Sequence, residues 1–160
     1  MKVDFNELPE EARIWIYPAN RPFTEQEMTL IKQRLDVFVE SWSAHSVPLK
    51  ASYLLPYNRF IVLAVDQTET RASGCSIDSS VRMIQELEVE FSVSLLDKMN
   101  VTYKQGEFLA YKSLSDFKKM AKDRAVSAST IVFNNLVDTK IEFETHWEVP
   151  AIESWHSRFL

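Results

Sequence analysis

The sequence predicts one domain of the α+β class over residues 1–160. Hydrophobic residues make up 46% of the chain and charged residues 26%, a composition that can bury a core and differs from that of disordered chains. Apolar residues recur with a period of two in some segments and with a helical period in others. Because no repeat and no linker rich in Pro, Gly or Ser separates these segments, we expect them to share one fold.

The first two elements are predicted to be a strand and a helix. Residues 13–17 alternate and are rich in β-forming side chains, and a turn at 20–22 ends them. Thr24 and Glu27 have the spacing of a capping box, which begins a helix. The apolar residues of this helix recur at steps of three and four, at Met28, Ile31, Leu35, Phe38 and Trp42.

A hairpin and a second helix follow. Residues 49–55 alternate, a turn interrupts them, and residues 60–65 are then apolar without a break, which indicates a central strand. Asp66 ends this strand, and a polar loop leads to a helix that Ser76 or Asp78 is expected to cap. The inward face of this helix is predicted to hold Ile77, Val81, Ile84, Leu87 and Phe91.

The second half begins with another predicted hairpin, formed by residues 101–104 and 107–111 around Gln105-Gly106. Ser115 is expected to cap a short helix behind it. This helix turns Phe117, Met120 and Ala121 inward and Lys118, Lys119 and Lys122 outward.

The C-terminal segment is less regular. Residues 131–137 favour a strand. Residues 141–149 alternate as a strand does, but Thr139 and Glu142 have capping-box spacing, so we favour a helix that ends before Pro150. The aromatic residues of the tail 155–160 predict that it docks on the core.

The first six elements therefore have the order strand, helix, strand, strand, helix, strand. This is the order of a ferredoxin-like βαββαβ unit, in which residues 101–104 supply the last strand. The remaining residues would form a C-terminal α/β extension.

The formal charge of the chain is −5, which disfavours nucleic acid as a partner because it repels phosphate backbones at long range. Lys98 to Arg124 is an exception, since seven basic and three acidic residues give it +4 and leave −9 for the rest. A solvated lysine face is the commoner structure for such a segment. A local anionic partner, including nucleic acid bound by this patch, stays open as an alternative.

The single cysteine, Cys75, cannot form an intramolecular disulfide, and the N-terminal residues lack the apolar region of a secretion signal. We therefore expect a cytoplasmic protein. The longest apolar run, residues 60–65, is too short to span a membrane.

Several cofactor motifs are absent from the sequence. The two glycines, Gly74 and Gly106, lack the setting of a P-loop or a dinucleotide fingerprint, so ATP hydrolysis by a P-loop mechanism is excluded. No zinc or EF-hand pattern is present. A site of carboxylates and histidines is conceivable near His146 and His156, but the spacing is nonspecific and favours surface polar residues, so we expect no metal. We expect no cofactor.

The segment 71–80 is the one loop in which the sequence predicts a binding site, because it lies between a strand end and a helix start. Backbone N–H groups and the positive end of a helix meet at such a junction and stabilise an anion. The candidate ligand-binding residues are Arg71, Ser73, Gly74, Ser76, Asp78 and Arg82.

Cys75 lies in the same loop, where a thiolate would be stabilised for the same reason. A thiol enzyme would use Cys75 as nucleophile and a histidine as base, for which His156 is our candidate beside His146 and His45. A cysteine phosphatase is excluded, since six residues instead of five separate Cys75 from Arg82. The alternative is that Cys75 is a small buried residue behind the helix cap.

Three stretches carry a resemblance to known proteins: WIYPANRPFT at 15–24, ASGCSIDSSV at 72–81 and WHSRF at 155–159. They resemble a family of small bacterial proteins that are often labelled as ABC transporter ATPases. The resemblance covers nearly the whole chain. The label would imply ATP hydrolysis, which the missing P-loop does not support.

These observations predict a cytosolic binding or interaction module that takes a small anionic ligand or a protein partner at residues 71–80. The alternative is a thiol-dependent hydrolase or transferase that uses Cys75.

Overall fold

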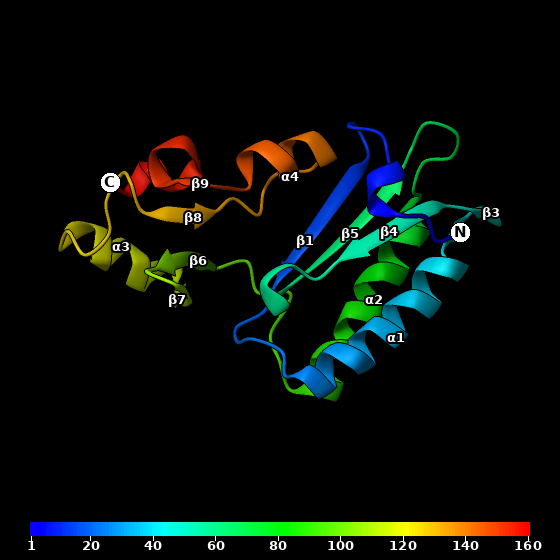
Figure 1. Cartoon of the computed structure of the whole chain (residues 1–160), viewed down its shortest axis with the longest axis horizontal. Coiled ribbons are helices and arrows are strands. Elements are labelled where there is room, and N and C mark those ends of the chain that lie inside the picture. Colours follow the sequence, from blue (N-terminus) through cyan, green and yellow to red (C-terminus); the bar gives the residue numbers. More distant parts are fainter. The chain divides into compact units, whose positions relative to one another are not determined.

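The computed structural model describes all residues from Met1 to Leu160. The chain divides into two compact units, of which unit 1 comprises Met1–Leu96 with Asp138–Ile141 and unit 2 comprises Asp97–Val137 with Glu142–Leu160. Both units combine helices with antiparallel sheets, so the α+β class is confirmed (Figure 1). The single domain expected over residues 1–160 stays a prediction.

Unit 1 is built on a three-stranded antiparallel sheet with the order β1-β5-β4. Its strands are β1 (Arg13–Pro18), β4 (Lys50–Leu54) and β5 (Phe60–Asp66). All residues from Phe60 to Val65 are fully buried, and β5 pairs on both sides. The uninterrupted apolar run thus marks the central strand, as the sequence predicts.

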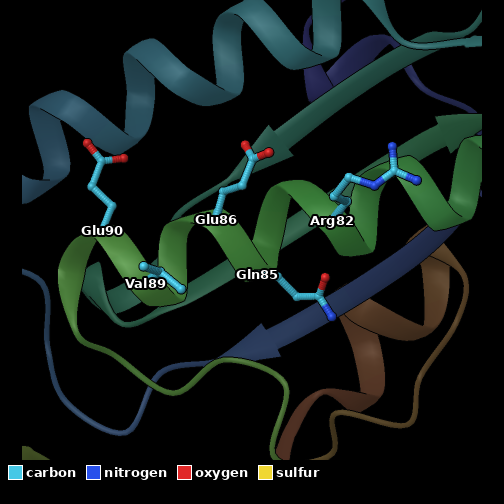
Figure 2. Close-up of a pocket in the computed structure, with 5 residues that line it drawn as sticks. All are labelled: Arg82, Gln85, Glu86, Val89 and Glu90. Carbon is cyan, nitrogen blue, oxygen red and sulfur yellow. The ribbon is translucent and has the colours of Figure 1, made fainter.

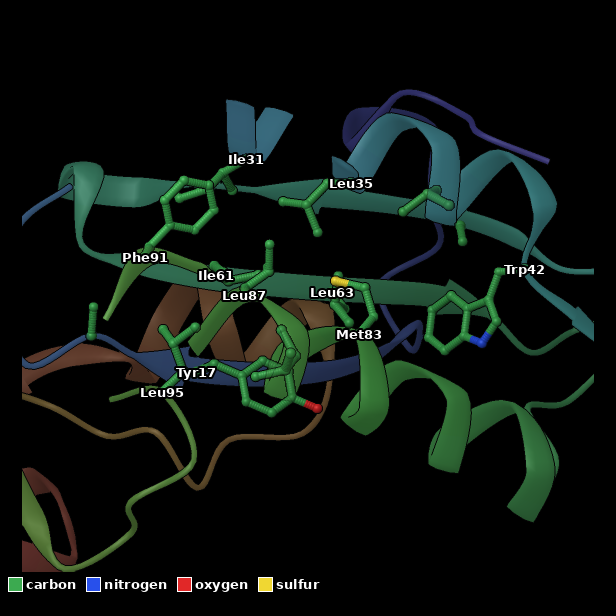
Figure 3. Packing of buried hydrophobic residues seen from close by; sticks show 14 of the residues in the cluster. Tyr17, Ile31, Leu35, Trp42, Ile61, Leu63, Met83, Leu87, Phe91 and Leu95 are labelled. Carbon is green, nitrogen blue, oxygen red and sulfur yellow. The ribbon is translucent and has the colours of Figure 1, made fainter. Parts of the chain in front are cut away.

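Helices α1 (Glu25–Ser41) and α2 (Gly74–Phe91) pack side by side on one face of this sheet (Figure 1). Ile31 and Leu35 of α1 and Leu87 of α2 lie against alternate residues of β5, Ile61 and Leu63 (Figure 3). The capping box of α1 is present, because Thr24 and Glu27 exchange side chain and backbone hydrogen bonds. The remaining small elements of unit 1 are η1 (Phe5–Glu7), η2 (Pro56–Asn58) and the hairpin of β2 (Ser43–Ala44) and β3 (Val47–Pro48).

The order β1-β5-β4 is that of the first three strands of a ferredoxin-like unit, but the complete unit is not confirmed. Residues 101–104, expected as the fourth strand, belong to a different sheet. The free edge of β1 instead meets the segment around Thr139, where Arg13 and Thr139 form an antiparallel bridge and the Ile14 amide donates to Asp138 O at 2.9 Å.

Unit 2 contains a four-stranded antiparallel sheet with the order β7-β6-β8-β9. The strands are β6 (Asn100–Gln105), β7 (Phe108–Ser113), β8 (Ile131–Phe133) and β9 (Glu148–Pro150). Helix α3 (Leu114–Lys122) follows β7, and the core that it covers contains Val101, Tyr103, Phe117, Val126, Val132 and Ala151.

Several boundaries in this half of the chain correct the prediction. Ser113, and not Ser115, caps α3. The strand expected over 131–137 ends at Phe133. The segment 141–149 divides between α4 (Lys140–His146) and β9, which includes Pro150 at its end. The tail does dock, since Trp155 and Phe159 of η4 (Trp155–Phe159) pack against the core of unit 2, behind η3 (Ala151–Glu153).

No helix of the structure is long and apolar enough to cross a membrane.

Candidate functional site

The loop that leads into α2 is held by hydrogen bonds of its own side chains. Asp66 Oδ1 accepts from the backbone N–H and the hydroxyl of Thr68, at 2.9 and 2.7 Å. Gln67 Oε1 accepts from the Ala72 amide at 3.1 Å, across the loop. These bonds tie the end of β5 to Ala72, the residue before the start of the α2 cap.

Ser73 is the N-cap of α2, which corrects the expectation that Ser76 or Asp78 caps it. Ser73 Oγ accepts from the Ser76 amide at 3.1 Å, and Ser76 Oγ accepts in return from the Ser73 amide. The Ser-x-x-Ser spacing is the sequence signal for this box, with serine in the place that Glu or Gln takes more often. Ser76 is only 2% exposed, so Ser73 and Ser76 serve the helix cap.

The cap leaves two amides of the first turn without an acceptor in the protein, those of Gly74 and Cys75. The next two amides are used, since the Ser76 amide donates to Ser73 Oγ and the Ile77 amide donates to Ser73 O at 2.9 Å. No acidic residue lies in the first turn. Free N–H groups at the positive end of an 18-residue helix attract an anion.

The surroundings of these amides are open, with Arg71 before them and Asp78 one turn after Gly74. Both Gly74 and Cys75 are exposed, and a Cβ added to Gly74 would meet no atom within 4 Å. Arg71, three residues before Gly74, is exposed and has no ion-pair partner. Arg71, Gly74 and Cys75 are therefore all exposed within five consecutive residues at the start of α2.

Asp78 and Arg82, the other two predicted ligand residues, are exposed further along α2. Arg82 lies seven residues after Cys75 on the same helix face, which is about 10 Å along the axis. Figure 2 shows Arg82 beside a shallow depression that Gln85, Glu86, Val89 and Glu90 also line. Since this depression is separate from the first turn, Arg82 does not join the group formed by Arg71, Gly74 and Cys75.

Cys75 is exposed, so the alternative of a buried packing cysteine is wrong. Of the three histidines, His45 lies in unit 1, in the β2–β3 hairpin that contacts α2. The indole N–H of Trp42, next to this hairpin, donates to Ser76 O at 2.8 Å. The sequence could not distinguish His45 from the other two, because the distance between loops depends on the fold.

His156 lies in unit 2 and is fully buried. Its ring stacks on Trp155 with 3.9 Å between centroids and meets the edge of Phe117, and Nδ1 contacts the Ser154 hydroxyl. Burial, with a smaller effect from Arg158, lowers the pKa of His156 to about 4. The ring is enclosed by residues of its own unit, so nothing in this environment supports its expected role as base for Cys75.

No group of three or more His, Cys, Asp or Glu side chains could hold a metal ion. No protein-family model, no curated protein and no solved structure matches the chain.

Proposed function

We propose that the protein is a cytosolic binding module that takes a small anionic ligand, of the size of a phosphate or carboxylate group, at the start of α2. The observation that carries this proposal is the pair of free amides of Gly74 and Cys75, with the exposed and unpaired Arg71 just before them in the chain. Two N–H donors and a guanidinium supply the charge and the hydrogen bonds that an oxyanion needs. Ser73 and Ser76 position the donors by fixing the cap.

Isothermal titration with inorganic phosphate and with acetate tests the proposal. Arg71→Gln should weaken phosphate binding by about tenfold, because it removes one charge-assisted hydrogen bond of about 1.5 kcal/mol. Arg82→Gln is the matched control, since it removes the same charge two turns further along α2 and should leave the affinity unchanged. Equal affinities of wild type and Arg71→Gln would contradict the proposal.

A thiol-dependent hydrolase or transferase is the second candidate function, favoured by the exposure of Cys75 in the same turn. Its thiolate would attack a carbonyl carbon of the substrate, and the free amides would stabilise the oxyanion formed as the C=O π pair moves to oxygen. Collapse would expel the leaving group, protonated by the histidine, and the thioester left on Cys75 would be cleaved by water or an acceptor. His45 in the hairpin beside α2 would be the base of this unit.

Alkylation of Cys75 with iodoacetamide as a function of pH separates the two candidates, since no other thiol competes. A rate that stays high down to about pH 6, and that falls in His45→Gln, would support the enzyme. A rate that follows an ordinary exposed thiol would support the binding module.

A further inference from the structure

Unit 2 carries a concentration of basic side chains that the protein does not neutralise. Between Lys98 and Arg124 only Lys104 has an ion pair, with Glu148 at 2.9 Å. The other six side chains are exposed and have no carboxylate partner. They are Lys98, Lys112, Lys118, Lys119, Lys122 and Arg124.

Four of these cations lie together on and just after α3, and we call them the α3 basic face: Lys118, Lys119, Lys122 and Arg124. The three lysines occupy an arc of about 100° around the helix, opposite Phe117, which is fully buried. Lys118 and Lys122 are about 6 Å apart along the axis. Asp116 and Asp123 lie beside the face, Asp116 in the first turn and Asp123 at the C-cap.

Arg124 occupies a backbone position that favours glycine. Its φ is 61°, in the left-handed region, at the residue that follows the C-cap Asp123. Its amide donates to Ala121 O at 3.1 Å, which closes the helix end. Arg124 thus holds its exposed side chain just beyond the last turn of α3.

An exposed aromatic ring lies on the same side of the sheet as α3. Phe108 of β7 is 77% exposed. In the register of β7 with β6 it alternates with Leu109 and shares the sheet face of Ala110, which packs against the core that α3 covers. Phe108 therefore offers a flat apolar surface on the sheet face that α3 covers.

We propose that unit 2 binds single-stranded nucleic acid, with phosphates on the α3 basic face and a base stacked on Phe108. Cations that follow a backbone, combined with an exposed aromatic ring, are the features that such binding uses. An anionic membrane fits less well, because the apolar residues of α3 are already packed in the core and cannot enter a bilayer. The overall charge of −5 opposes long-range attraction. Because contacts between the cations and phosphates release counterions, we expect binding to be strongest at low salt.

We test this proposal by fluorescence anisotropy with labelled single strands of about 12 nucleotides. A DNA strand and an RNA strand with the same base sequence are compared. If all four cations contact phosphates, the slope of log K against log salt is about −3. Lys119→Gln/Lys122→Gln should bring this slope closer to zero by about 1.4. The control Lys32→Gln/Lys50→Gln makes the same change of net charge in unit 1 and should leave the slope as it is. Binding of either strand would support the proposal, and a preference for the RNA or the DNA strand would identify the source.

Phe108→Ala tests the stacking separately. It should weaken binding between about 5-fold and about 150-fold and leave the salt slope unchanged. The control Val89→Ala truncates an equally exposed apolar side chain in unit 1. The proposal is overturned if no strand binds at about 50 mM salt or if Phe108→Ala binds as tightly as the wild type. It is also overturned if Lys119→Gln/Lys122→Gln and Lys32→Gln/Lys50→Gln have the same salt slope. Full competition by vesicles with anionic lipids would overturn it as well. Loss of binding in Arg71→Gln would overturn it too, and would assign the anion to the start of α2.

Discussion

His156 is the most completely buried titratable side chain of unit 2. Its side chain is fully buried, its Nε2 has no hydrogen-bond partner, and the neighbouring Arg158 adds a positive charge. Each of these features favours the neutral ring, and burial is the largest. His156 therefore binds a proton less readily in the folded protein than in the unfolded chain.

This difference predicts that stability is lost as the pH falls. Between the ordinary pKa of 6.5 and the folded pKa of about 4, only the unfolded state takes up the proton, so the free energy of unfolding decreases by about 3 kcal/mol. Urea unfolding followed by tryptophan fluorescence at about pH 7 and about pH 4 measures the decrease. His156→Phe should remove this part of the pH dependence, whereas exposed His146→Gln should not. Equal losses in wild type and His156→Phe would refute the explanation.

The backbone conformation of Arg124 predicts that replacing it with glycine raises the free energy of unfolding. Glycine adopts its left-handed conformation without the clash of a Cβ atom, so Arg124→Gly should stabilise the protein by about 1 kcal/mol. Lys119→Gly, inside α3, should destabilise it by a similar amount. Urea unfolding of the two variants checks both signs, and a loss of stability in Arg124→Gly would show that its side chain has a structural role.

At the scale of elements, the signals that are local in sequence predicted the structure well. The capping box at Thr24 and the apolar residues after it are sufficient to predict α1. The run from Phe60 to Val65 reveals a strand buried on both faces. The partner of β6 could not be predicted in this way, because the choice of sheet depends on contacts far apart in the sequence. The segment 141–149 was ambiguous because its alternation runs through α4, at Ile141, Phe143 and Thr145, as well as into β9.

The candidate site was predictable in part for the same reason. The junction of a strand and a helix at residues 71–80 follows from periodicity alone. Periodicity leaves the first residue of a helix uncertain by a few residues. That residue decides which serine caps α2, which amides remain free and whether Cys75 is exposed.

The cap of α2 gives a prediction at this scale. Ser73→Ala should lower the free energy of unfolding by about 1 kcal/mol, because the Ser76 amide loses its acceptor. Asp78→Ala, one turn into the helix, should change it by less than about 0.5 kcal/mol. Thermal unfolding of both variants by circular dichroism compares them directly. The reverse order of effects would mean that the helix begins later than residue 74.

At the scale of the whole molecule, unit 1 is completed by residues from the second half of the chain. Lys140 is 7% exposed, its amide donates to Ala12 O, and its ammonium group donates to Leu8 O at 2.8 Å. This contact joins residues 132 positions apart in the sequence. No local pattern could reveal it, which is why the edge of β1 was assigned to another segment.

Lys140→Met tests the importance of this closure, because it keeps the aliphatic stem and removes the donor. It should destabilise the protein by about 2 kcal/mol, since Leu8 O loses a charge-assisted hydrogen bond inside the protein. Lys32→Met, at an exposed position on α1, is the control and should have little effect. Urea unfolding of both variants gives the comparison, and equal stabilities would mean that the segment 138–141 is held by its backbone alone.

The most direct test of the proposed anion site is a phosphate titration followed by amide chemical shifts in 15N-labelled protein. The account predicts that the Gly74 and Cys75 amides shift most, that both saturate with one dissociation constant, and that Arg71→Gln weakens this constant. Shifts that are absent at these two amides, or that centre on Arg82 and the depression beside it, would contradict the account.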